Sequence, residues 1–293
     1  MENQKGQALI IVLLVMSIVL TVVLSSVSRS VTEIQTTTYE EDSLRAFSAA
    51  EAGIEDKLIN PQIGVETIES VDPSDASIFY KAMTTAPSPD SKQYIYPNPL
   101  SSGESATFWL VSHDNSGLLS CNGFPCWEGG VMSVCYKPQG ESQEPAVEIT
   151  IYYDETNKSS AVPNNFADLT VYRKLFDFDN TRDNGGEDPG GTCNFGDIIF
   201  TRSASVNTVS EISPTCRDGC LILVKVRVLY ASDQQIGLWL RSGGPTSFPA
   251  QRINISSTGV AGDSMRKVDV TRGFPEPPSL FDTAVFSLDG LEK

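Results

Sequence analysis

The sequence predicts an α+β protein in which one long N-terminal helix precedes an antiparallel, β-rich domain. Three observations lead to this class. Residues 8–27 carry no charge, residues 29–60 continue with helical spacing and no proline, and short apolar or alternating runs dominate after residue 106. The length of 293 residues allows one or two domains.

The uncharged run from Ala8 to Val27 is 20 residues long. A helix of about that length spans the ~30 Å hydrocarbon core of a bilayer. We therefore expect a single transmembrane helix over residues 8–27. A cleaved secretory signal peptide is the alternative, but its apolar core usually has only about 7–15 residues.

Helical periodicity continues beyond the apolar run. Apolar residues such as Val31, Ile34 and Leu44 recur mostly at steps of three or four, and Gly53 is the only glycine in residues 29–60. This spacing predicts an amphipathic helix that ends before the proline. One helix over residues 7–60 would be roughly 80 Å long.

Residues 61–105 are rich in proline, serine, aspartate and asparagine. This composition predicts a loop-rich connection with one short element near residues 78–83.

Residues 106–293 predict an extracellular β-rich domain. Alternation is clear where Val147, Ile149 and Ile151 are separated by polar residues, as in a half-buried strand. The runs follow one another too closely for crossover helices, which favours antiparallel sheets in a sandwich or in two β units. The candidate strands are 107–111, 131–136, 147–153, 169–175, 198–201, 221–230, 236–240, 252–256, 267–271 and 283–287, with a subdivision expected near 177–193.

Six cysteines lie beyond the predicted membrane segment, which favours disulfides. They are Cys121, Cys126, Cys135, Cys193, Cys216 and Cys220. Their clustering suggests local pairs, with Cys216–Cys220 as one of them. Zinc is the alternative, because the pairs near residues 121 and 216 could supply four thiolates.

One acidic loop is a weak calcium candidate. Asp177, Asp179 and Asp183 offer oxygen ligands on a turn-forming stretch, but Arg182 occupies the place of the glycine that an EF-hand requires. We expect a solvated acidic loop and no cofactor.

The net charge of −16 argues against nucleic acid as a partner, since phosphate contacts need clustered Lys and Arg. No nucleophile elbow, phosphate-binding loop or dinucleotide-binding glycine pattern is present. The single histidine, His113, is expected in a surface loop. We expect no enzyme activity.

The first sixty residues resemble those of a known family. Six residues, Met1 to Gly6, form a leader that ends in Lys-Gly, and residues 50–53 read Ala-Glu-Ala-Gly. Together with the Ser- and Val-rich membrane helix, these features resemble type IV prepilins, most closely the PilX-like minor pilins and the pseudopilins of type II secretion. The resemblance implies that a prepilin peptidase cuts between Gly6 and Gln7 and that the new amine is methylated.

The resemblance further implies assembly with other pilin subunits through residues 7–60. The chain would start in the bacterial cytoplasmic membrane, in contact with lipid, with its C-terminal domain extracytoplasmic, and would then enter a pilus or remain at the cell surface. Gln7 stands where major pilins usually have phenylalanine, and Ile11 where they have a glutamate. These departures favour a minor subunit. The alternatives are a single-pass anchored adhesin that does not polymerise, or a hydrolase with an unrecognised carboxylate pair.

Overall fold

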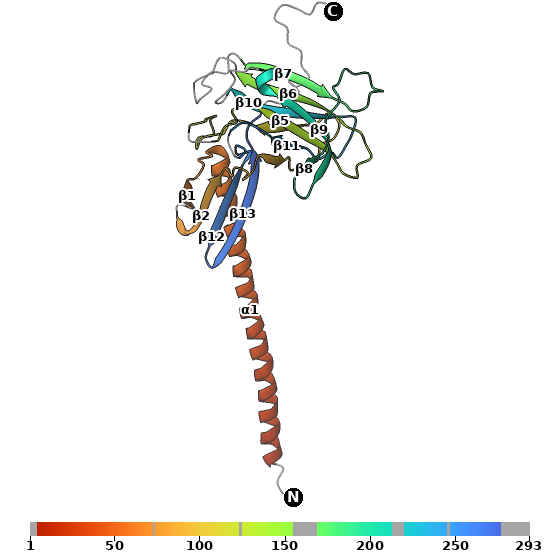
Figure 1. Ribbon diagram of the computed structural model, residues 1–293. Coiled ribbons are helices and arrows are strands. Elements are labelled where there is room, and N and C mark those ends of the chain that lie inside the picture. Colours follow the sequence, from red (N-terminus) through yellow and green to blue (C-terminus); the bar gives the residue numbers. More distant parts are fainter. Residues whose placement is uncertain are drawn as a thin grey trace, which may run out of the picture. The chain divides into compact units, whose positions relative to one another are not determined.

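The computed structural model describes residues 5–72, 74–122, 125–154, 169–212, 220–244 and 247–276. It confirms the α+β class, with a long apolar helix followed by antiparallel sheets (Figure 1). Helix α1 runs without a break over Lys5–Ile59 and ends just before Pro61, as the periodicity predicts. The chain divides into two compact units.

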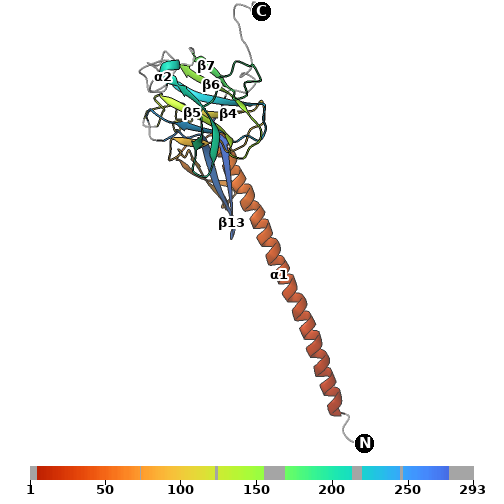
Figure 2. The same cartoon turned by 45° about the vertical axis from the view of Figure 1, so that its right-hand side comes forward.

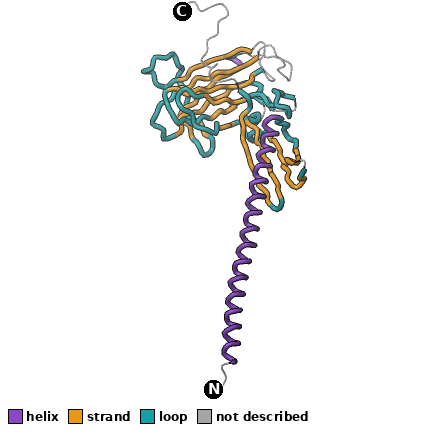
Figure 3. Tube along the Cα trace, turned by 180° about the vertical axis from the view of Figure 1, so that it is seen from behind, coloured by secondary structure: helices purple, strands orange, loops and turns teal. Residues whose placement is uncertain are grey.

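The first unit consists of α1 and a four-stranded sheet of order β1-β2-β12-β13. Its strands are β1 (Glu66–Asp72), β2 (Asp75–Thr85), β12 (Arg252–Ala261) and β13 (Ser264–Gly273). Figure 3 shows these strands beside the C-terminal turns of α1. The prediction of a loop-rich connection is therefore wrong for residues 66–85, which form an antiparallel hairpin. The hairpin lacks a clear apolar alternation because polar residues lie on both of its faces.

The second unit is a β-sandwich, one of the two predicted arrangements (Figure 2). One sheet has the order β4-β10-β6-β7, with β4 (Ser105–Trp109), β10 (Leu221–Leu229), β6 (Ala146–Asp154) and β7 (Leu169–Phe176). The other has the order β3-β11-β5-β9-β8, with β3 (Gln93–Ile95), β11 (Gly237–Leu240), β5 (Val131–Pro138), β9 (Ile199–Asn207) and β8 (Cys193–Asn194). A single turn of helix, α2 (Thr208–Glu211), follows β9.

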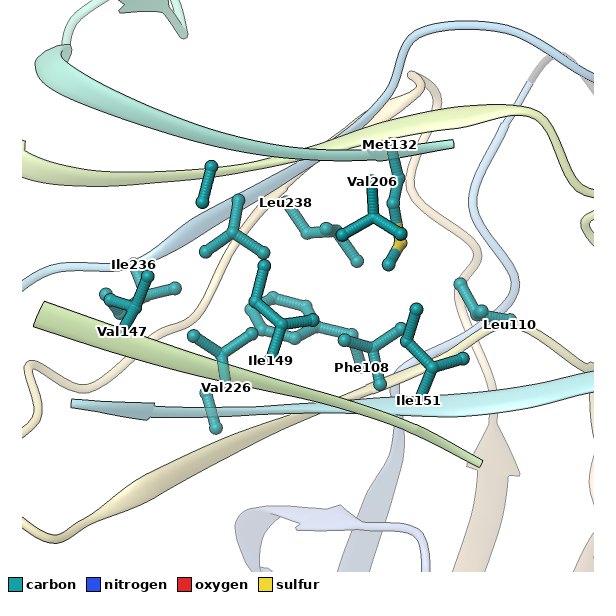
Figure 4. Packing of buried hydrophobic residues seen from close by; sticks show 14 of the residues in the cluster. Phe108, Leu110, Met132, Val147, Ile149, Ile151, Val206, Val226, Ile236 and Leu238 are labelled. Carbon is teal, nitrogen blue, oxygen red and sulfur yellow. The ribbon is translucent and has the colours of Figure 1, made fainter. Parts of the chain in front are cut away.

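Side chains from the inner faces of both sheets form the core of the sandwich. Phe108 and Ile149 from one sheet face Val206 and Leu238 from the other, and all four are fully buried (Figure 4). Strands on both sides of residues 177–193 contribute to this core, so the predicted subdivision there is wrong. Every predicted strand between residues 107 and 271 overlaps an observed one, whereas 283–287 lies outside the described residues.

All strands of the sandwich lie between β2 and β12 in the sequence, yet these two strands are neighbours in the first sheet. The hydroxyl of Thr85 donates to the carbonyl of Asn254 at 3.4 Å, where β2 ends and β12 begins. The sandwich is therefore inserted in the sequence between two strands that are neighbours in the first sheet.

Candidate assembly helix and its docking sheet

The N-terminal half of α1 exposes a continuous apolar surface. Its large apolar side chains from Leu9 to Leu24 are 52–69% exposed. In the described part of the chain, α1 is the one helix that is long and apolar enough to cross a membrane. An uncovered apolar surface of this extent requires lipid or other protein around it.

Hydroxyl groups in this segment are satisfied within the helix. Ser17 Oγ donates to the carbonyl of Leu14 at 2.8 Å, and Thr21 Oγ1 donates to that of Ile18 at 2.8 Å. A polar group without a partner is costly in hydrocarbon, and such back-bonding removes that cost. These hydroxyls are therefore compatible with a lipid environment.

The C-terminal half of α1 packs on the first sheet through small side chains. Ala46, Ala49 and Ala50 are fully buried, and Ile54 is 7% exposed. Their spacing of three or four residues places them on one helix face. Beneath them lies Gly259 of β12, where an added Cβ would stand 2.0 Å from the Ala46 carbonyl oxygen. Helix and strand thus meet backbone to backbone.

The glycine of the Ala-Glu-Ala-Gly stretch lies on the same contact. A Cβ on Gly53 would stand 2.3 Å from Ser257 Oγ and 2.6 Å from the Tyr80 ring. No larger residue fits here unless Ser257 or Tyr80 moves. The alanines and the glycine therefore have a shared structural role, which is close approach of α1 to β2 and β12.

Polar contacts fix both ends of this docked segment. Lys57 is 2% exposed and donates from Nζ to Thr67 Oγ1 of β1 at 2.5 Å. At the other end, Arg266 of β13 donates to Ser43 Oγ at 2.8 and 2.6 Å. These bonds define the position of the helix along the sheet as well as its rotation about its axis.

Tyr80 adds a further polar group beneath the helix. Its hydroxyl donates to Glu69 Oε2 at 3.1 Å, and burial together with this carboxylate raises the pKa of Tyr80 to about 12. The phenol therefore stays protonated and remains a donor throughout the physiological pH range.

The predicted cleavage position lies at the start of α1. Gly6 and Gln7 belong to the helix, which begins at Lys5. The backbone at Gly6 is therefore helical. Cleavage after Gly6 stays a prediction, and a peptidase would have to unwind the first turn to reach the bond.

The structure shows disulfide pairings that the sequence analysis had left open. Cys121–Cys126 is a local pair, as the clustering suggests, whereas Cys135 pairs with Cys193 across 58 positions and links β5 to β8. Cys220 is also disulfide-bonded, and the predicted Cys216–Cys220 pair involves Cys216, which lies outside the described residues. Zinc at the Cys121 pair is excluded because both of its sulfurs are in a disulfide.

The acidic loop is held by its own arginine. Asp177 is 3% exposed and accepts from Arg182 Nη1 at 3.0 and 3.2 Å and from Asn184 Nδ2 at 2.7 Å. Arg182 Nε lies 3.3 Å from Asp179 Oδ2. The backbone of Asp183 is in the left-handed region, with φ of 45°. Within the described ranges no group of carboxylate, Cys or His side chains has the geometry of a metal site.

His113 is not in an exposed loop, contrary to the prediction. It is 6% exposed, stacks on Phe274 at 3.6 Å between ring centroids, and meets Trp109 edge-on at 4.7 Å. Burial lowers the pKa of His113 to about 4, so the imidazole is neutral in the folded protein. Its burial could not be predicted from the sequence, because the following residues are polar and Phe274 is far away in the chain.

Comparison with known protein families finds no matching family model, and no curated protein matches the sequence.

Proposed function

We propose that the chain is a minor type IV pilin-like or pseudopilin subunit that is cut after Gly6 and assembled through α1. In this proposal the exposed N-terminal half of α1 leaves lipid and packs among the helices of other subunits. The β-rich part stays outside the membrane. No cofactor and no catalytic step are required.

The observation that carries the proposal is the division of α1 into two halves with different surroundings. One half exposes its apolar side chains on all sides, while the other packs closely on β2 and β12 through Ala46, Ala50 and Gly53. A tether that only anchors a domain needs no such rigid continuation. A helix fixed to its own domain can transmit the position of its membrane half to that domain, which is what ordered packing of subunits requires.

Two further features support the proposal, and the first of them favours a minor subunit. Ile11 leaves the helix without the carboxylate that major pilins place in the membrane, so this chain can offer only its N-terminal amine to a neighbour. Its 20 uncharged residues before Ser28 contain small side chains such as Ser17 and Ser25, which allow close helix approach in lipid.

The proposal is tested by determining the N-terminal residue of the mature protein. The full chain is expressed with a prepilin peptidase or with a catalytically inactive form of it, and intact-mass and N-terminal peptide spectra are recorded. A start at Gln7 with a methylated amine, seen only with the active peptidase, is the expected result. An intact Met1 in both samples, or a start near Arg29, would refute the proposal.

The alternative is a single-pass anchored adhesin or binding module that never polymerises. Fractionation of sheared cells separates the two. A subunit processed at Gln7 that sediments with sheared fibres supports assembly, whereas one that remains wholly in the membrane fraction favours the anchored module.

A further inference from the structure

Strand β4 lies at the edge of its sheet, because β10 is its only neighbour among the described strands. Leu110, which directly follows β4, donates its backbone N–H to the carbonyl of Ile222 at 2.9 Å, on the side of β10. In an antiparallel pair the direction of the backbone groups alternates from one residue to the next. The N–H and C=O groups of Thr107, three residues earlier and at the centre of β4, therefore point away from β10.

A side chain already imitates a neighbouring strand at this edge. Gln251 Oε1 accepts from the backbone N–H of Trp109 at 2.8 Å, and Gln251 Nε2 donates to the Trp109 carbonyl at 2.9 Å. These are the two bonds that a paired strand makes with one residue of an edge. Trp109 is two residues from Thr107, so both residues direct their backbone groups to the same side.

A cavity of about 480 Å³ lies along this edge. Its lining includes Ser105 and Thr107 of β4, Tyr96 and Leu100 from the segment before β4, and Glu276, all of the second unit. The hydroxyl of Thr107 is buried, so this residue borders the cavity with its other atoms. The volume is far larger than the roughly 10–15 Å³ that one water molecule needs, so a segment of chain can enter it.

The sheet face beside this edge is shielded from solvent, although it points away from the sandwich core. Thr107, Lys225 and Thr150 lie side by side across β4, β10 and β6. Their strand neighbours, such as Val224 and Ile149, belong to the core, so these three side chains face the other way. Lys225 is nonetheless only 3% exposed and Thr150 only 5% exposed. The second sheet of the sandwich packs on the opposite face, so another part of the chain provides this cover.

The C-terminal segment of the chain, residues 277–293, is placed to provide it. It follows directly from Glu276, which lines the cavity, and it lies beyond the described residues. The sequence predicts a strand over residues 283–287. The seven steps from Glu276 to the start of that strand span at most about 24 Å. Because the five residues of β4 extend over about 17 Å, the predicted strand can reach β4 and follow its whole length.

We propose that residues 283–287 of the same chain add to the open edge of β4 as a fifth strand of its sheet. Main-chain pairing of this kind requires no particular side chain from β4. The side chains of the added strand alternate between the cavity and the shielded sheet face. The addition also covers an edge that otherwise favours pairing with other chains. A partner chain can therefore reach β4 only after the C-terminal segment leaves it.

Hydrogen exchange at single-amide resolution, on the full chain in detergent, tests this pairing. The amides of Thr107 and of residues 283–287 should exchange slowly, because paired strands protect them. A chain that ends at Asp282 lacks the added strand, and Thr107 should exchange at least about 10-fold faster in it. A chain that ends at Leu288 keeps the strand and is the matched control, in which Thr107 should stay within about twofold of the native rate.

A second variant does not shorten the chain. In Ala284→Pro/Val285→Pro, one of the two prolines must remove a donor that faces β4, because adjacent residues alternate in direction. Thr107 should again exchange at least about 10-fold faster. The amide of Ile149, in the core, should be unchanged in every variant, which shows that the sandwich remains folded.

Three results would overturn the proposal. The first is exchange of residues 283–287 at the rate of an unstructured peptide in the full chain. The second is equal exchange at Thr107 in the chains that end at Asp282 and at Leu288. The third is protection of residues 283–287 that falls on dilution, since this would place the segment on a second copy. The N-terminus and fibre experiments do not involve β4, so either proposal can fail without the other.

Discussion

The contact between Gly259 and α1 makes the sharpest prediction. In Gly259→Ala, the new Cβ would stand 2.0 Å from the Ala46 carbonyl oxygen and 2.4 Å from the Ala50 amide nitrogen. Ordinary carbon contacts are about 3.5 Å or longer. Because both clashing atoms belong to the helix backbone, no side-chain rotation can relieve them, and α1 must move away by roughly 1.5 Å.

The free-energy cost of this movement has two parts, the clash itself and the loss of packing between α1 and β12. Overpacking a well-packed contact typically costs about 1–3 kcal/mol, and a backbone clash belongs at the upper end. The shift also separates the fully buried Ala46, Ala49 and Ala50 from β12. We therefore expect a loss of about 3 kcal/mol in the local free energy of opening, which corresponds to amide exchange faster by about 100-fold.

The amide exchange rate is measured by hydrogen exchange and mass spectrometry on the full chain in detergent. Faster exchange should appear in peptides that cover 46–54 of α1 and 252–261 of β12, and not in the sandwich core. Gly273→Ala is the matched control, because Gly273 lies in β13 of the same sheet and has nothing within 4 Å of an added Cβ. Equal exchange in the two variants would refute the backbone contact as the basis of docking.

Three other predictions concern the sandwich. Because burial lowers the pKa of His113 to about 4, from about 6.5 when unfolded, the unfolded chain binds an extra proton between these pH values. The free energy of unfolding should therefore fall by on the order of 3 kcal/mol as the pH falls through this window. In urea unfolding at pH 7 and pH 4, His113→Phe should lack this part of the difference between the two pH values. An equal pH dependence in the native chain and the variant would contradict the prediction. Replacing Cys135 and Cys193 together by Ala frees a loop of 58 residues and should lower the free energy of unfolding by about 4 kcal/mol in chemical denaturation, clearly more than removal of the short-range disulfide. Arg182→Met should cost about 3 kcal/mol in the same assay, since it leaves the buried Asp177 carboxylate without its cation, and recovery on addition of Ca²⁺ would show instead that the loop can hold a metal.

Much of this fold could be predicted because its strongest signals are local. The 20-residue apolar run, the absence of proline before Pro61 and the alternation around Ile149 each define one element without help from distant residues. The sheet order could not be predicted, because β2 and β12 meet only after the whole sandwich has intervened.

The docking sheet was missed for a related reason. In β1, Thr67 and Glu69 are polar because they bind Lys57 and Tyr80 beneath the helix, so the strand lacks the apolar alternation that marks a buried face. The signal that could have revealed the contact was the alanine-rich stretch ending in Gly53, since small residues at helical spacing indicate close packing. The sequence alone does not identify the strands on which this part of the helix packs.

The discontinuous sheet also imposes an order on biosynthesis. Helix α1 emerges from the ribosome before β12 and β13, which include Gly259, and all strands of the sandwich are made in between. A nascent or prematurely terminated chain that stops before Arg252 would carry the complete helix but only half of the sheet that grips it. Docking of α1 therefore reports that synthesis has passed β13, and a chain that stops earlier would carry a helix that the sheet does not hold in the orientation of the intact chain.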